Sequence, residues 1–119
     1  MVEDKARGEA RGEGFRGGRR FARFPVSVPV LVRTEQFPGE DITGVVRNVS
    51  VGGLIAEFPR EISSATPVRL LLKTRRGPLE VEARVVWSAA TETKVRHGLA
   101  FIHQQDSDFA INLFIGENR

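Results

Sequence analysis

Apolar and polar residues alternate along most of the chain, which is the period of two expected of strands with one buried face. The first alternating segment is the clearest, because Val26, Val28, Val30 and Val32 form one continuous valine face. Further segments of this kind are separated by glycine and proline, and they lie at 42–50, 54–58, 68–74, 79–87 and 96–102. The pattern therefore predicts six short strands.

Three details refine this prediction. Pro29 cannot donate a ladder hydrogen bond, so we expect an edge position or an outward-facing backbone at that point. In the strand 79–87 the expected inward residues end with Val85 and Trp87. Pro38 with Gly39, and the "RRGP" segment at 75–78, are typical of turns.

The period changes after residue 105, where a helix is expected over 106–116. Asp106 or Ser107 can cap its start, and Gly116 is the expected stop. Its apolar residues fall at helical spacing: Phe109, Ala110, Ile111, Leu113 and Phe114. A helix this short is marginal alone, so it must pack on the sheet. The chain is therefore predicted to be all-β, a small six-stranded antiparallel barrel with a C-terminal α-helix.

Composition is consistent with one globular domain of 119 residues, with 40% hydrophobic and 28% charged residues. There is no cysteine, which excludes disulfides and thiolate chemistry. No apolar run is long enough to span a membrane, and the polar N-terminus does not resemble a signal peptide, so a cytoplasmic location is expected. Residues 1–17 are rich in Gly, Glu and Arg and are predicted to be a disordered tail.

The densest positive charge lies just before the first strand. Arg19, Arg20 and Arg23 fall within five positions, directly after Gly17 and Gly18. A guanidinium group can bind a phosphate or the O6/N7 edge of guanine with two parallel hydrogen bonds. These arginines are therefore either a solvated tail or one side of an anion-binding site.

A second unusual stretch is "NVSVGGL", residues 48–54. Asn48 and Ser50 are two positions apart, so on extended backbone both side chains face the same way. Gly53 permits a turn with positive φ and a close backbone approach. Alone, the stretch could be a polar β-bulge. Combined with the arginine segment, it predicts a site for a compact ligand that carries both phosphates and guanine edges.

The remaining candidates favour structural roles. His97 and His103 would be about 20 Å apart along a strand, so they cannot share a metal ion. The sequence has no arrangement typical of a catalytic triad, of paired catalytic carboxylates or of a phosphate-binding Gly-Lys-Ser loop, so no enzymatic function is expected. We expect Arg75 and Arg76 to be solvated at a hairpin tip, and Trp87 to pack in the core or at its rim.

These residues resemble the signatures of the PilZ domain family, R-x-x-x-R followed by (D/N)-x-S-x-x-G. Arg19 and Arg23 match the first motif, and Asn48, Ser50 and Gly53 match the second. The similarity continues through "VEARVVW", "HGLAFI" and the closing helix, so it covers the chain from about residue 18 to its end.

The resemblance implies a PilZ domain over 18–119, with a ligand-binding loop at 18–25, a barrel at 26–103 and a helix at 106–116. It implies binding of the bacterial second messenger cyclic di-GMP, with no other cofactor. Arg19 and Arg23 would be the main ligand contacts and Arg20 a secondary one, while Asn48, Ser50 and Gly53 would receive the other side of the ligand. Ordering of the loop would signal to a separate protein partner.

Two alternatives stay open at this point. Some members of the family do not bind the ligand and act as adaptors through protein contacts. A nucleic-acid-binding barrel would use the same arginines with Arg16, Arg75 and Arg76 as a phosphate-tracking patch. The sequence disfavours this second alternative, because no exposed aromatic residues are expected between the charges: Phe21 and Phe24 are expected to anchor the loop into the core.

Overall fold

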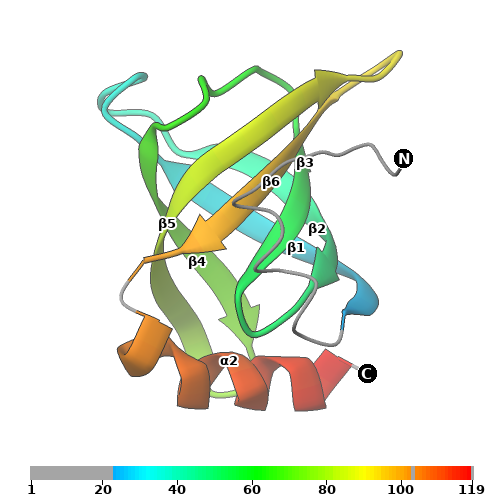
Figure 1. Ribbon diagram of the computed structural model, residues 1–119, viewed down its shortest axis with the longest axis vertical. Coiled ribbons are helices and arrows are strands. Elements are labelled where there is room, and N and C mark those ends of the chain that lie inside the picture. Colours follow the sequence, from blue (N-terminus) through cyan, green and yellow to red (C-terminus); the bar gives the residue numbers. More distant parts are fainter. Residues whose placement is uncertain (1–22, 103, 119) are drawn as a thin grey trace, which may run out of the picture.

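The computed structural model describes residues 23–102 and 104–118, with the backbone alone for 104–110. Within these residues, six strands form a closed antiparallel barrel and one helix lies across one end of it (Figure 1). The elements are β1 (Phe24–Arg33), β2 (Ile42–Val49), β3 (Gly53–Phe58), β4 (Pro67–Thr74), β5 (Gly77–Ala90), β6 (Val95–Phe101) and α2 (Gln104–Asn118). The predicted fold class is confirmed. The predicted tail 1–17 and the candidates Arg19, Arg20 and His103 lie outside the described residues.

The barrel interior is built from the alternating apolar positions that the sequence indicated. The strand order is β1-β2-β3-β6-β5-β4, and β1 pairs with β4 to close the barrel. Residues on every strand are buried, among them Val32, Val46, Phe58, Leu70 and Val85. Pro29 is exposed and pairs with β2, whereas the pairing of β1 with β4 begins only at Val30, which agrees with the expected edge-like position.

The side of the strand on which Trp87 lies differs from the prediction, because β5 contains a bulge. The register between β5 and β6 shifts between Val85 and Trp87, so that Val85 lies opposite Leu99 and Trp87 lies opposite Gly98. Leu99 is buried in the interior, and its neighbour Gly98 therefore faces outward, as does Trp87 across from it. The prediction that Trp87 faces the core is wrong, since one extra residue reverses the face of the strand.

The C-terminal helix is longer than predicted. It spans Gln104–Asn118 rather than 106–116, and Gly116 does not end it. The last turn is closed instead by the Asn118 side chain, whose Nδ2 donates to the Phe114 carbonyl oxygen at 2.9 Å. Phe114 is buried, as is Ile111, whereas Leu113 is 41% exposed and does not join the expected apolar cluster.

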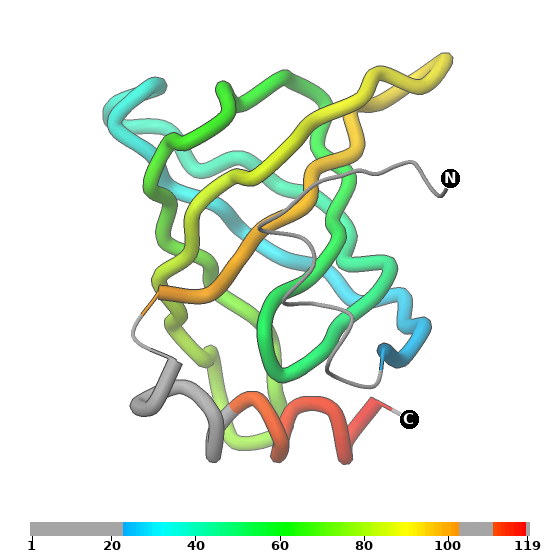
Figure 2. Tube along the Cα trace, viewed as in Figure 1, coloured from blue at the N-terminus to red at the C-terminus, as the bar shows by residue number. Residues whose placement is uncertain are grey.

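The unequal lengths of the strand pairings determine the shape of the barrel at the end away from α2. β5 pairs with β4 only from Gly77 to Arg84, but with β6 as far as Ala90. The hairpin between β5 and β6 consequently projects from the barrel at the end away from α2 (Figure 2). Among the described residues, no helix combines the length and the apolar composition that crossing a membrane requires.

His97 is a buried interior residue rather than a surface residue. Its Nε2 accepts a hydrogen bond from the Ile62 backbone N–H at 3.0 Å, and its ring packs edge-on against Phe58 with centroids 5.3 Å apart. Nδ1 has no hydrogen-bond partner among the described residues. Burial lowers the pKa of His97 below its ordinary 6.5, with weaker opposing effects from the Val95 backbone and the Glu61 carboxylate. The ring is therefore neutral in the folded protein at neutral pH.

This burial predicts a pH-dependent stability. Because the unfolded chain takes up the proton first, the free energy of unfolding should be largest above about pH 7. It should fall by at most about 1.4 kcal/mol per pH unit as the pH drops below 6.5 toward the lower folded-state pKa. Urea unfolding between pH 7.5 and 5.0 measures this change. His97→Gln should remove most of the slope; an equal slope in the wild-type protein and in His97→Gln would contradict the assignment.

Candidate functional site

The two motifs meet where β1 begins and β2 ends. The Arg23 Nη1 atom donates to the Asn48 Oδ1 atom at 3.2 Å, joining residues 25 positions apart in the chain. The contact follows from strand pairing, since Phe24 lies opposite Val49 and Pro25 opposite Asn48. Partial burial lowers the pKa of Arg23, but a guanidinium remains protonated at any physiological pH. The structure therefore brings together one residue from each predicted motif.

Ser50 has a different environment from Asn48, so the prediction that both present one polar face is wrong. β2 ends at Val49, and the Ser50 side chain is only 1% exposed. Its hydroxyl donates to the Gly53 carbonyl oxygen and accepts from the Gly52 N–H, each at 3.2 Å. The Ser50 backbone N–H also donates to the Gly53 carbonyl oxygen at 2.8 Å. Ser50 thus shapes the turn between β2 and β3 and positions its neighbours.

Gly53 is required for close packing of strands rather than for a left-handed turn. Its φ is not positive, in contrast to Gly39 and Gly77, which lie in turns at +80° and +116°. A Cβ atom at position 53 would lie 2.1 Å from the Leu99 carbonyl oxygen on β6. The expected positive φ is therefore wrong, while the expected close backbone approach is correct.

The contact at Gly53 predicts opposite outcomes for two glycine substitutions. Gly53→Ala should destabilise the protein by about 1–3 kcal/mol, because β3 and β6 must separate to admit the methyl group. Gly116→Ala is the matched control: no atom lies within 4 Å of its Cβ position, and alanine should stabilise helix α2 by roughly 0.5–1 kcal/mol. Thermal unfolding monitored by circular dichroism measures both changes. A neutral Gly53→Ala would show that the turn can adjust freely.

A second group of charged residues lies on the outside of the barrel, and one of its members, Arg47, is the neighbour of Asn48 in the chain. Arg47 Nε and Arg96 Nη2 donate to the two carboxylate oxygens of Glu57 at 3.1 and 2.9 Å, and together they cover that side chain to 11% exposure. The hydrogen bond from Arg96, reinforced by Arg47, lowers the pKa of Glu57 despite its burial. This cluster carries a net positive charge. Sequence reasoning missed it because its members lie on three different strands.

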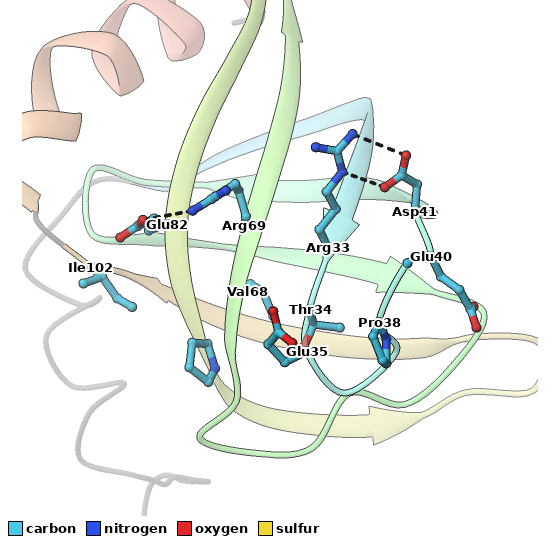
Figure 3. Close-up of a pocket in the computed structure, with 12 residues that line it drawn as sticks. Arg33, Thr34, Glu35, Pro38, Glu40, Asp41, Val68, Arg69, Glu82 and Ile102 are labelled. Carbon is cyan, nitrogen blue, oxygen red and sulfur yellow. Dashed lines mark hydrogen bonds and ion pairs between the residues drawn. The ribbon is translucent and has the colours of Figure 1, made fainter.

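A separate cavity of about 620 Å³ lies at the opposite end of β1 (Figure 3). β1 has ten residues, so the cavity at its far end lies roughly 30 Å from Arg23. None of the candidates that the structure describes, Arg23, Asn48, Ser50 and Gly53, lines it. Its arginines face carboxylates, with Arg33 Nε 2.6 Å from Asp41 Oδ1 and Arg69 Nη2 3.5 Å from Glu82 Oε2. Within the described part of the chain, no group of three or more acidic, histidine or cysteine side chains could hold a metal ion.

In a comparison with protein families, one family model matches the sequence. The sequence model of the PilZ domain matches residues 18–113, which include the first described strand, the turn at Ser50 and most of α2. No curated protein matches the chain.

Solved structures agree in fold. The PilZ domain of YcgR from Escherichia coli, solved with cyclic di-GMP, has a TM-score of 0.70 at 14% identity, covering 82% of this chain and 88% of that one. The PilZ domain of CeSA from a cellulose-synthesizing bacterium has a TM-score of 0.62 at 23% identity, covering 80% and 95%. The MrkH–cyclic di-GMP complex of K. pneumonia gives 0.65 at 16% identity, covering 81% and 50%. At these identities the likeness establishes a shared barrel fold.

Proposed function

Because the chain belongs to the PilZ domain family, we propose that it is a bacterial receptor for cyclic di-GMP. The observation that carries the proposal is the hydrogen bond between Arg23 and Asn48, which joins the two motifs at one place. The similar structures of YcgR and MrkH contain cyclic di-GMP, which supports the same ligand class here. PilZ domains are receptor or adaptor domains, and we propose a non-catalytic role for this one.

Arg23 is suited to hold both the protein and the ligand. A guanidinium group presents its donors in one plane, so it can bond an amide oxygen and a phosphate oxygen or guanine edge together. The neutral Asn48 orients Arg23 without neutralising its charge. We propose that Arg19 and, secondarily, Arg20 complete the grip from the preceding loop, residues 18–25. Arg47 and Arg96 add positive potential on the same side of the barrel.

Ser50 and Gly53 then contribute mainly through geometry. The Ser50 hydroxyl is occupied by the turn, and Gly53 lets β3 approach β6, so both hold Asn48 at the correct place. We therefore expect substitutions at these two positions to act on the shape of the site and on stability. Losing Ser50 should cost less affinity than losing Arg23, since Arg23 bears the charge that contacts the ligand.

Signalling would follow from ligand-induced order in the loop. Binding that orders a segment uses part of the interaction energy, and the ordered segment then presents a new surface. We propose that this surface acts on a separate protein partner in the cytoplasm.

The described residues give little support to nucleic-acid binding. Among the described residues, five arginine side chains on the barrel surface are paired with carboxylates: Arg33, Arg47, Arg60, Arg69 and Arg96. Such pairs reduce the positive charge that the described barrel surface could offer to a phosphate-tracking patch.

Titration calorimetry with cyclic di-GMP tests the proposal. Wild-type protein should bind, whereas Arg23→Ala should bind about tenfold to a hundredfold more weakly, because one charge-assisted contact is lost. Arg76→Ala is the matched control, since Arg76 is exposed at the β4–β5 hairpin tip. GTP should not compete, and added salt should weaken binding.

Two results would contradict the proposal. Folded wild-type protein that produces no heat with cyclic di-GMP would favour the adaptor function. Strong, salt-sensitive binding to long oligonucleotides, without binding to the cyclic dinucleotide, would favour nucleic acid.

A further inference from the structure

Strand β5 extends beyond its neighbour β4 and has an edge there that no described strand covers. β5 pairs with β6 as far as Ala90, but its pairing with β4 ends at Arg84. Residues 88–90, here called the β5 edge, therefore have a described strand on one side only. They lie in the hairpin that projects from the barrel (Figure 2). A strand edge of this kind presents N–H and C=O groups with which another strand can pair.

The chain that precedes β4 follows β5 for a short distance and then turns away. The Val85 N–H donates to the Thr66 carbonyl oxygen at 3.0 Å, and the Ala65 N–H donates to the Val85 carbonyl oxygen at 2.8 Å. Ala65 has a φ of +72°, a left-handed conformation that is unfavourable for a residue with a Cβ atom. The main chain leaves β5 at this residue. After it, only the Ser64 hydroxyl reaches the strand, where it donates to the Val86 carbonyl oxygen at 3.0 Å.

The hydrogen bond at the hairpin turn identifies the main-chain groups that face the β5 edge. The Thr91 N–H donates to the Lys94 carbonyl oxygen at 2.7 Å, so it points toward β6. The direction of main-chain groups alternates along an antiparallel strand, so Ala89 also bonds to β6. Ser88 and Ala90 consequently direct their N–H and C=O groups away from β6. Within the described residues, these groups have no hydrogen-bond partner.

We propose that the β5 edge pairs with the same edge of a second copy of this chain, in an antiparallel arrangement centred on Ala89. A two-fold axis at Ala89 places Ser88 of one copy opposite Ala90 of the other, and each such pair exchanges two hydrogen bonds. This pairing uses every outward N–H and C=O group of Ser88 and Ala90. Ala89 then lies opposite its own counterpart as a non-hydrogen-bonded pair, with Cα atoms about 4.5 Å apart.

The limits of the β5 edge suit a second copy as the partner. The Ser64 hydroxyl covers Val86 at one end, and the hairpin turn follows Thr91 at the other. In the two-fold arrangement the turn of one copy begins opposite Val86 of the other, so neither limit obstructs the pairing. Residues 88–90 contain no charged side chain and no proline, which commonly protect strand edges. The formal net charge of +3 is modest, so repulsion between two copies is small.

Sedimentation equilibrium of the full chain tests the proposal. The interface is short, so association should be weak and should appear between about 10 µM and 1 mM. Over this range the average mass should rise from one chain toward two. Ala90→Pro should stay monomeric, because proline removes the outward N–H and leaves the bonds to β6 in place. Ala90→Ser is the matched control, since it keeps that N–H and should associate as the wild type does.

Charges at position 89 test the register. Ala89→Lys should prevent self-association, because the two-fold axis places two positive charges directly opposite each other, and Ala89→Glu should do the same with two negative charges. A mixture of the two variants should associate again, since opposite charges then face each other across the axis. A contact elsewhere on the surface would not produce this reciprocal rescue.

Disulfide formation gives a second test of the register, because the chain contains no cysteine. Treated with oxidised glutathione, Ala89→Cys should form disulfide-linked dimers roughly tenfold faster than Thr93→Cys, since only position 89 lies within disulfide distance of its counterpart. Both residues are exposed, so random collisions should link them at similar rates.

The outcomes are independent of the proposed function, because none of these measurements includes cyclic di-GMP. Wild-type protein that stays monomeric at about 1 mM would overturn the inference. Undiminished association of Ala90→Pro, shown to be folded by circular dichroism and thermal unfolding, would overturn the β5 edge as the contact. Failure of the mixed position-89 variants to associate, with equal disulfide rates at positions 89 and 93, would overturn the arrangement centred on Ala89.

Discussion

Closure of the sheet into a barrel is the constraint on which the rest of this structure depends. Pairing of β1 with β4 leaves no free sheet edge along the paired lengths, and it gives every strand one inward and one outward face. The inward faces of six short strands must fill one interior, which is packed mainly with valine, leucine, isoleucine, alanine and phenylalanine side chains. The neutral His97 is accommodated there only because Ile62 supplies its hydrogen bond and Phe58 packs against its ring.

Closure of the barrel also affects the outer surface on which the candidate site lies. A strand in a closed barrel can redirect an outward side chain only by inserting an extra residue, because the interior face is already occupied. The bulges before Asn48 and Trp87 do this without disturbing Val49 or Val85, both of which remain buried. Interior packing therefore leaves the residues on the outer face of these strands free to vary.

The described arginines differ in the groups that their side chains contact. Arg33 and Arg69 lie against exposed carboxylates, and such surface pairs contribute little to stability. Arg47 and Arg96 are held by the nearly buried Glu57 and keep a net positive charge on that face. The Arg23 guanidinium donates to the neutral amide of Asn48.

The sequence by itself determined the strands, their inward residues, the fold class and the motif residues, because period-two alternation and turn residues are local properties of the chain. Only the tertiary structure decided which face Trp87 occupies, why Ser50 is buried, why Gly53 must lack a side chain, and how Arg47, Glu57 and Arg96 meet. Each of these depends on register and on contacts between strands far apart in sequence, and one bulge is enough to reverse a face that alternation alone predicts. The helix end is a different case, because the Asn118 side chain closes the last turn by a local bond to Phe114, four positions earlier, where Gly116 was expected to end the helix.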